Sequence, residues 1–377
     1  MKEPILIVSV DFPPHTDGVS TVSQELAERL TKYGKKIVAI GPASPGDRAY
    51  DKRQKFPVIR TAWYEFGYLR FIPLLFASIY AVIRYRIKLI LAMNIAYGGA
   101  VSCFLFRPLG IKYVLWAYGY EFCKFKKNFF LNSLYKRIYS DSEKIFAISH
   151  FVKRRLIEFG IPESKIGLIF PGTSPEKYYP QEAPDWFKEK IGLKDKKILL
   201  SVSRLIERKG HDAVIKSLPS LLSKFPDLVY LIVGKGPMRG HLEQLANGLG
   251  LNSQVRFLGH VTEEELLHLY NSCDIFVMPS REIEEKGDVE GFGIVYLEAN
   301  ACGKPVIGGR SGGCGEAIID GETGILVDPL DVEGISQAID KFLSDKKLAK
   351  RLGENGRQRV LKELNWNNYV KKFLQII

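Results

Sequence analysis

The stretch Asp288–Glu298, which reads DVEGFGIVYLE, sets two carboxylates eight positions apart around a glycine-rich turn and the start of an apolar helix. Gly291 and Gly293 carry no side chain, so the main chain there can approach a ligand closely. The N–H groups that open a helix attract an anion. These features fit a ligand that carries a diphosphate and many hydroxyls, with Glu290 and Glu298 accepting from the hydroxyls. A capped surface helix with incidental acids is the alternative interpretation.

Size and composition place this stretch in an ordinary globular protein. The chain has 377 residues, which predicts two domains, each large enough for its own core. Its hydrophobic content is 46% and its charged content 25%, as in soluble proteins. Five cysteines without CxxC spacing indicate neither a disulfide framework nor a zinc site. The apolar run 71–83 is shorter than the roughly 20 residues that a spanning helix needs, so we expect no segment that crosses a bilayer.

The positive charge lies in the first half of the chain. Residues 1–180 hold 27 Lys and Arg against 14 Asp and Glu, whereas residues 181–377 hold 27 against 28. Half of the 44 aromatic residues fall between Phe56 and Tyr139. A basic, aromatic half suits an anionic membrane surface or a negatively charged substrate. Nucleic acid is disfavoured as a partner, because the cations are dispersed among large apolar side chains and no nucleic-acid motif occurs. A solvated basic face over a normal core is the alternative.

Short apolar runs alternate with amphipathic helical patterns along the chain. The clearest helical pattern is 19–33, where Val22, Leu26 and Leu30 recur at four-residue spacing. Such alternation implies right-handed crossovers and parallel sheets. A loop-like stretch, 171–184, divides two sets, so we predict an α/β protein with two doubly wound parallel-sheet domains. The predicted strands are 5–10, 36–40, 88–92, 112–116, 144–148, 166–170, 197–203, 228–233, 255–258, 274–278, 305–308 and 324–327.

Polar motifs follow three of the predicted strands at their carboxyl ends, where doubly wound sheets bind ligands. RLIERKG follows Ser203, GKGP follows Val233, and a long loop leads from Met278 to the acidic stretch. Arg204 and Lys209 share the first loop and could neutralise a diphosphate, the arginine as a fork and the lysine as a point charge. Each loop alone is a weak signal, but three strand ends that carry such loops together indicate a site.

These motifs resemble those of the family 4 retaining glycosyltransferases with the GT-B fold. The resemblance is carried by S-R-L-x-x-x-K-G from Ser203, V-G-x-G-P from Val233 and E-G-F-G-I-V-x-L-E from Glu290, and it is dense over 197–330. The version DVEGFGIVYLEA is similar to the bacterial phosphatidylinositol mannosyltransferases. The resemblance implies two Rossmann-like domains facing across a cleft. They are an acceptor-binding domain, 1–175 completed by a C-terminal helix at about 365–377, and a donor-binding domain, 176–364.

The resemblance also implies roles for single residues. Arg204 and Lys209 would hold the donor's diphosphate, and Glu290 would contact the sugar hydroxyls with help from main-chain N–H groups around Phe292 and Gly293. Glu298 would bind the nucleotide ribose. The remaining donor-binding positions implied by the motifs are Gly18, Gly234, Lys235, Gly291 and Ile294.

The first half of the chain departs from the family pattern at two positions. Asp17 precedes Gly18, where relatives have two glycines, and Tyr118 stands where relatives have a histidine. A tyrosine there either donates a hydrogen bond or is a packing aromatic. His15, Asp17 and Glu121 are the candidate acceptor contacts, with loop or capping roles as the alternative.

The reaction implied is transfer of a hexose, with retention, from a nucleotide diphosphate sugar to a hydroxyl of a lipid-linked or anionic glycan acceptor. GDP-mannose is the favoured donor over UDP-hexoses. We expect no cofactor and no metal, because two cations already face the diphosphate and no metal-ligand cluster occurs. The enzyme is expected in the cytoplasm, peripheral to the inner face of the membrane. A sugar-nucleotide epimerase and a catalytically silent sugar-nucleotide binder are the alternatives.

Overall fold

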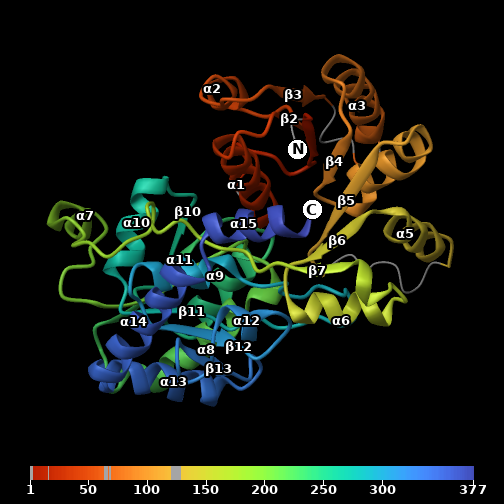
Figure 1. Cartoon of the computed structure of the whole chain (residues 1–377). Coiled ribbons are helices and arrows are strands. Elements are labelled where there is room, and N and C mark those ends of the chain that lie inside the picture. The colour runs from red at the N-terminus through yellow and green to blue at the C-terminus, as the bar shows by residue number, and fades with distance from the viewer. Residues whose placement is uncertain (1–2, 16, 63–66, 68, 120–128) are drawn as a thin grey trace. The chain divides into compact units, whose positions relative to one another are not determined.

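A computed structural model describes residues 3–15, 17–62, 67, 69–119 and 129–377 (Figure 1). The chain forms two compact units. Unit 1 comprises Met1–Pro171 together with Trp366–Ile377, and unit 2 comprises Gly172–Asn365. The C-terminal segment therefore belongs to the same unit as the first strands.

Unit 1 is built on a seven-stranded sheet with the order β3-β2-β1-β4-β5-β6-β7. All neighbouring strands are parallel, and every residue of the central strands β1 and β4 is buried. Burial on both faces explains why these strands are continuous apolar runs. The strands are β1 (Ile5–Val8), β2 (Ile37–Pro42), β3 (Val58–Thr61), β4 (Leu89–Ala92), β5 (Lys112–Ala117), β6 (Lys144–Ala147) and β7 (Ile166–Leu168).

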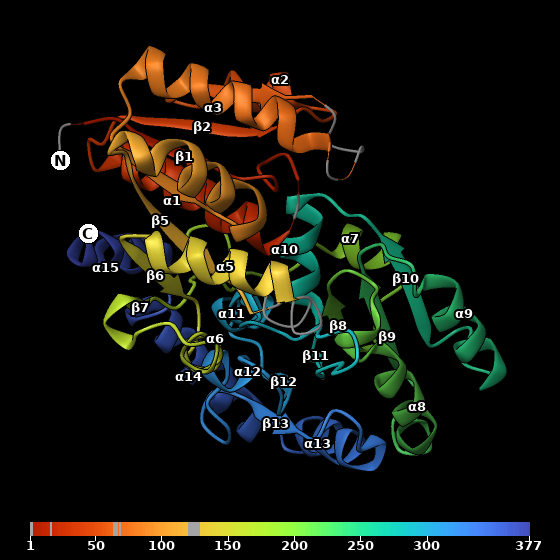
Figure 2. The ribbon, with the colours of Figure 1, turned by 90° about the vertical axis from the view of Figure 1, so that its right-hand side faces the viewer.

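Helices cover both faces of this sheet, with α1 and α3 on opposite sides (Figure 2). Asp17 is the N-cap of α1, since its carboxylate accepts from the Ser20 N–H at 2.8 Å. The α-helices described in unit 1 are α1 (Gly18–Lys32), α2 (Asp47–Asp51), α3 (Phe71–Tyr85), α5 (Phe129–Asp141), α6 (His150–Glu158) and α15 (Trp366–Ile376). Short π or 3-10 turns are η2 (Ile95–Gly99), η3 (Ser102–Phe106), η4 (Arg107–Leu109) and η5 (Glu163–Lys165).

Unit 2 repeats the plan with a six-stranded parallel sheet in the order β10-β9-β8-β11-β12-β13. Its strands are β8 (Lys197–Val202), β9 (Leu228–Val233), β10 (Val255–Gly259), β11 (Ile275–Met278), β12 (Val306–Gly309) and β13 (Ile325–Val327). Its helices are α7 (Asp185–Lys190), η6 (Glu207–Lys209), α8 (His211–Leu222), α9 (Arg239–Gly248), α10 (Glu263–Ser272), α11 (Ile294–Ala301), α12 (Cys314–Ala317), α13 (Val332–Ser344) and α14 (Lys346–Lys362).

The predicted fold class is confirmed: both units are Rossmann-like parallel sheets, and the strand order reverses beside β1 in unit 1 and beside β8 in unit 2. The twelve predicted strands all occur, with ends within two residues of those observed. The edge strand β3 was missed. This strand has only four residues, VIRT, and is interrupted by Arg60, so its sequence shows no long apolar run that would predict a strand. In the structure Arg60 forms an ion pair with Asp51 at 2.6 Å.

The C-terminal helix α15 completes the core of unit 1. Tyr369 and Phe373 are buried, and the indole N–H of Trp116 in β5 donates to the Tyr369 hydroxyl at 2.6 Å. The ring of Phe373 lies 5.5 Å from Trp116 and 5.3 Å from Phe146. A helix from the far end of the chain thus fills a gap against β5 and β6.

Among the described residues, no helix is both long enough and apolar enough to span a bilayer. Cys103, Cys273, Cys302 and Cys314 are buried free thiols. Cys123 lies outside the described residues.

Replacing Phe373 by alanine should destabilise unit 1 by about 3 kcal/mol or more, because it removes a large buried ring from between two strands. Hydrogen exchange of the β5 and β6 amides measures this locally, and we expect faster exchange there than in unit 2. Gln375→Ala, at an exposed position of the same helix, is the matched control and should leave exchange unchanged. Unaltered protection in Phe373→Ala would show that α15 contributes nothing to that core.

Candidate active site

The loops after β8, β9 and β11 pack against one another through main-chain contacts that demand glycine. Gly234 has φ +128°, and a Cβ there would lie 1.9 Å from the Ser203 carbonyl oxygen. Gly210 has φ +72°, and its Cβ would lie 2.2 Å from the oxygen of Pro279. No side chain fits in either place. Gly234 also donates its N–H to the Gly259 carbonyl at 2.7 Å. The glycines therefore hold three strand ends together.

A buried carboxylate joins two of these loops. Glu290 is 9% exposed, and its Oε2 accepts from Lys209 Nζ at 2.5 Å and from Arg208 Nη1 at 2.7 Å. The Ser280 hydroxyl lies 3.5 Å from the same oxygen. Arg208 also pairs with Asp288, Nε to Oδ1, at 2.9 Å. Two cations from the β8 loop thus alternate with two acids from the β11 loop.

The charges around Glu290 decide its ionisation. Burial alone would raise the pKa of this carboxyl, but Lys209 and Arg208 outweigh burial and lower its pKa to about 2. Glu290 is therefore an anion at neutral pH, with no proton to give to a leaving group. Its ion pairs stabilise the fold above the usual carboxyl pKa of 4.5, and that stabilisation is lost as pH falls toward 2.

The structure separates the two predicted cations. Lys209 contacts Glu290, whereas Arg204 is exposed and, among the described residues, has no carboxylate partner for its guanidinium. Arg208 was not singled out from the sequence, although its side chain is only 15% exposed and touches both acids. Its position next to Lys209 was the only available signal. The β8 loop therefore presents one exposed arginine and one paired arginine.

The turn that carries Glu290 is fixed by close packing against Tyr296 and by hydrogen bonds to neighbouring segments. Gly293 has φ +95°, and a Cβ there would lie 2.4 Å from the ring of Tyr296. The Tyr296 hydroxyl donates to the Met278 carbonyl at 2.5 Å, and the Gly313 N–H donates to the Glu290 carbonyl at 2.8 Å. These bonds fix the turn to the ends of β11 and β12. The other predicted donor positions nearby are Gly291 and Phe292, which are buried, Ile294, which is half-buried, and Lys235, which is exposed.

Glu298 lies in α11 and is half-buried. Its Oε2 accepts from the Tyr270 hydroxyl at 2.6 Å, and the Tyr270 ring packs edge-on against Tyr178 at 5.6 Å. Burial raises the pKa of Glu298, and the bond from Tyr270 partly offsets that effect. Tyr270 was not found from the sequence, because it lies 28 residues away on another helix. It orients the carboxylate for which the family resemblance implies contact with a ribose.

A neutral histidine supports the β8 loop. His211 is buried, with Nε2 2.9 Å from the Ser203 hydroxyl and Nδ1 2.9 Å from the Tyr230 hydroxyl. Burial, aided by the charge of Lys209, lowers the pKa of His211 to about 3. The imidazole is therefore uncharged at neutral pH. It links the end of β8 to β9 without adding charge to the site.

The candidate residues of unit 1 lie around the ends of β1 and β5. Asp17 caps α1, and Gly18 begins that helix with open space where a side chain would stand. The His15 carbonyl accepts from the Ser20 hydroxyl at 2.5 Å. Tyr118, one residue past β5, is buried. Capping explains Asp17 locally, whereas the assignments to donor and acceptor are predictions. Glu121 lies outside the described residues.

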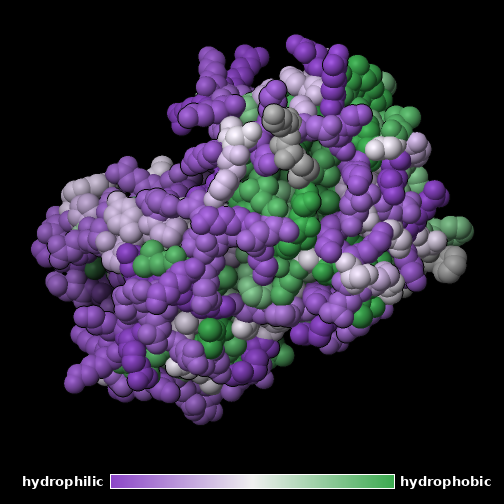
Figure 3. All heavy atoms as spheres, viewed as in Figure 1, coloured by the Kyte–Doolittle hydropathy of each residue, from purple (hydrophilic) through white to green (hydrophobic). Residues whose placement is uncertain are grey.

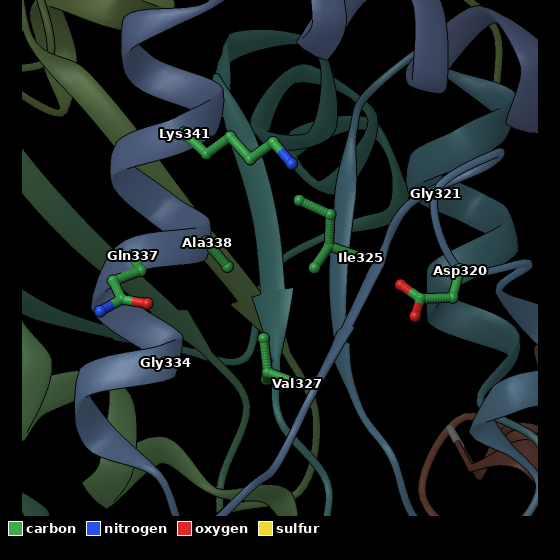
Figure 4. Close-up of a pocket in the computed structure, with 8 residues that line it drawn as sticks. All are labelled: Asp320, Gly321, Ile325, Val327, Gly334, Gln337, Ala338 and Lys341. Carbon is green, nitrogen blue, oxygen red and sulfur yellow. The ribbon is translucent and has the colours of Figure 1, made fainter.

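A separate hollow of about 350 Å³ lies between β13 and α13 (Figure 4). Ile325 and Val327 form its floor, and Asp320 and Lys341 lie at its sides (Figure 4). The Asp320 carboxylate is already bonded to Arg310 at 2.8 Å and to the N–H of Leu326 at 2.9 Å. This hollow includes none of the residues around Glu290, so it is not the candidate site. Within the described ranges, no group of three or more His, Cys, Asp or Glu side chains could hold a metal ion.

Two Rossmann-like units, with cations and acids gathered at the carboxyl ends of one sheet, define the class of GT-B glycosyltransferases. Solved structures share the whole fold. Sucrose-phosphate synthase from Thermosynechococcus elongatus superposes with a TM-score of 0.84 at 24% identity, covering 100% of this chain and 98% of that one. Anabaena HepE in complex with UDP-glucose gives 0.83 at 20% identity, covering 99% and 98%. These two likenesses concern the fold.

Residues 16–177 match the family described as Glycosyltransferase Family 4, and residues 184–359 match Glycosyl transferases group 1. The chain thus belongs with the family 4 glycosyltransferases of the GT-B fold. It is 29% identical to the GDP-mannose-dependent alpha-(1-6)-phosphatidylinositol monomannoside mannosyltransferase of Mycolicibacterium smegmatis, over 99% of this chain and 98% of the relative. The N-acetyl-alpha-D-glucosaminyl L-malate synthase of Bacillus anthracis is 26% identical, with coverage of 98% and 95%.

The two arginines of the β8 loop should differ sharply in their effect on stability. Arg208→Ala leaves two carboxylates without a shared cation, and we expect a loss of about 3 kcal/mol in the free energy of unfolding. Arg204→Ala is the matched control on the same loop and should change stability by less than about 0.5 kcal/mol. Urea unfolding of unit 2 without ligand measures both. Equal effects of the two substitutions would contradict the asymmetry.

His211 predicts a pH dependence of stability. The unfolded chain protonates this imidazole near pH 6.5, whereas the folded chain does so only near pH 3, so acidification favours unfolding between these values. Lowering the pH from 6.5 to 5 should cost about 1.6 kcal/mol through this residue. His211→Gln should flatten that slope, and His241→Gln, at an exposed histidine of the same unit, should not. Parallel slopes for wild type and His211→Gln would refute the assignment.

Proposed function

We propose that this glycosyltransferase moves a hexose, with retention of configuration and without a metal, from a nucleotide diphosphate sugar to a hydroxyl of a lipid-linked or anionic glycan. Unit 2 takes the donor and unit 1 takes the acceptor. The observation that carries this proposal is the alternation of Arg208, Lys209, Asp288 and Glu290 across two strand ends, with Arg204 exposed on the same loop as the two cations.

Charge balance supports a division of roles on the β8 loop. Arg208 and Lys209 are already matched by Asp288 and Glu290, so the cluster is near neutrality without ligand. Arg204 adds a positive charge that the described carboxylates do not match. We assign Arg204 as the first contact of the donor diphosphate. Lys209, held in place by Glu290, supplies the second positive charge as the bond between sugar and phosphate breaks.

The acids then serve hydroxyls and not proton transfer. Glu290 stays ionised because its pKa is lowered to about 2, so it accepts hydrogen bonds from the sugar while holding Lys209. Glu298, oriented by Tyr270, takes the ribose hydroxyls. Because Glu290 has a pKa of about 2 and is held by two cations, it is a poor base for the attacking hydroxyl, so we assign the proton of that hydroxyl to the departing diphosphate. The new glycosidic bond forms as the bond from sugar to diphosphate breaks.

The relatives favour a donor and a kind of acceptor. The Mycolicibacterium smegmatis relative, matched over nearly its whole length, is named as dependent on GDP-mannose and as acting on a phosphatidylinositol mannoside. A Corynebacterium glutamicum relative at 29% identity carries a similar name. We therefore favour mannose from GDP-mannose and a glycolipid acceptor. The basic first half of the chain fits a place in the cytoplasm at the inner face of the membrane.

Arg204→Ala and Lys209→Ala should each lower turnover by about 100-fold or more, the scale of losing one preorganised charge donor. The donor is first chosen by thermal shift, since a ligand at 100 times its Kd stabilises by about 2.7 kcal/mol. Release of nucleoside diphosphate in the presence of a glycolipid acceptor then reports transfer.

Lys224→Ala is the control for that experiment, because Lys224 pairs with Asp340 on the surface of unit 2 at 2.6 Å. It should leave turnover unchanged. Near wild-type rates in both Arg204→Ala and Lys209→Ala would rule out the proposed roles. Release of diphosphate without glycoside product would instead indicate hydrolysis.

A further inference from the structure

Helix α3 of unit 1 exposes several large apolar side chains on the surface. Leu69 just before the helix and four residues within it are exposed, and we name these five residues the α3 stripe: Leu69 (55%), Ile72 (42%), Phe76 (65%), Tyr80 (55%) and Ile83 (73%). At 3.6 residues per turn they share one face. Figure 3 shows apolar residues gathered at the upper right, where Figure 1 places α3.

The opposite face of α3 is fully used by the sheet. Leu74, Ser78 and Ala81 are buried, and the helix packs against β1, β2 and β3. Two of these three buried residues are small, which lets the helix lie close to the strands. The stripe therefore cannot rotate into the core, because the buried face is already packed.

Isolated apolar side chains on a surface need no explanation, but a contiguous row does. In unit 2 the large exposed apolar residues are spread over separate elements, as with Trp186 on α7, Leu249 after α9 and Leu330 before α13. The α3 stripe instead runs the length of one helix of 15 residues, about 22 Å. Such a continuous row marks a surface that another phase or molecule covers.

The charges around the stripe identify that partner as anionic. Between Glu65 and Glu121 the sequence contains no Asp or Glu. Arg84, Arg86 and Lys88 follow the stripe directly, and all three are exposed. An apolar row bordered by cations, within a stretch of sequence that contains no acid, is the pattern of a helix that lies in the interface of an anionic bilayer.

A second copy of the chain fits this surface poorly. In a twofold dimer the same patch faces itself, so one interface would contain Arg84, Arg86 and Lys88 of both copies. No acid of this segment could offset the repulsion. Negatively charged headgroups, by contrast, neutralise these cations while the acyl region receives the apolar side chains.

We propose that the α3 stripe, with Arg84 and Arg86, is the element that seats this enzyme on an anionic lipid bilayer. That membrane binding gives access to a lipid-linked acceptor rests on the proposed function. The exposure and charge that indicate the surface do not depend on it. The helix lies in the plane of the interface, held from behind by the sheet. The bilayer is thus approached by a preformed surface, without refolding.

Vesicle flotation of the full chain tests the proposal, using phosphatidylcholine vesicles with and without one-fifth phosphatidylglycerol. Wild type should float with the anionic vesicles. Phe76→Asp with Ile83→Asp should lower the bound fraction about tenfold or more, since it places charges in the apolar layer. Leu330→Asp, at a residue of unit 2 that is 71% exposed, is the matched control and should bind like wild type.

A second pair of variants separates charge from apolar contact. Arg84→Gln with Arg86→Gln should weaken binding to anionic vesicles about tenfold or more and leave binding to neutral vesicles unchanged. Thermal melting must show that all variants are folded. Full flotation of Phe76→Asp with Ile83→Asp overturns the proposal. So does a wild-type dimer in sedimentation that becomes monomeric in this variant while neither protein binds vesicles.

The failure of this proposal is distinguishable from failure of the proposed function. Nucleotide-sugar binding by unit 2 is measured without vesicles by thermal shift, and it should be equal in wild type and in the stripe variants. Vesicle binding without nucleotide-sugar binding would contradict the proposed transferase function but still support the proposed bilayer-binding surface. The reverse result would remove only the surface.

Discussion

The buried carboxylate of Glu290 is the constraint on which the candidate site depends. A buried anion is tolerated only when it is paired and hydrogen-bonded, and here Lys209 and Arg208 supply both. Because its partners come from another strand end, this pairing ties the β8 loop to the β11 loop. Gly210 allows main-chain contact between the same two loops, and Gly234 allows it between the β9 and β8 loops. Local charge and local backbone geometry therefore specify one arrangement.

That arrangement explains why two arginines four residues apart differ so much. The guanidinium of Arg208 is already paired within the fold, since it neutralises Asp288 and Glu290 together. Arg204 lies on the same loop but is exposed, which leaves its charge for a ligand. A site with every cation exposed would repel itself, and a site with every cation paired would have little attraction for a diphosphate. Dividing the roles keeps the loop stable before the donor arrives.

Most of the strands and part of the candidate site could be predicted from the sequence, for physical reasons. Most of the twelve predicted strands are buried apolar runs, whereas β3 at the sheet edge is short and half-buried, carries Arg60 and was missed. The acidic stretch Asp288–Glu298 could be singled out as a candidate site because its acids and glycines are close together in the sequence. Arg208 and Tyr270 could not be found, since their contacts with Glu290 and Glu298 join residues far apart in the chain.

Helix α3 shows how packing can reverse the usual meaning of an apolar helix. Its residues are hydrophobic on nearly all sides, a pattern typical of a helix buried in a core. Two of the three residues buried against the sheet, Ser78 and Ala81, are nevertheless small, although a core helix would place its largest side chains there. Small residues inside and Phe76 and Ile83 outside mean that the apolar area serves a contact beyond this unit. The absence of acids between Glu65 and Glu121 then selects an anionic surface as that contact.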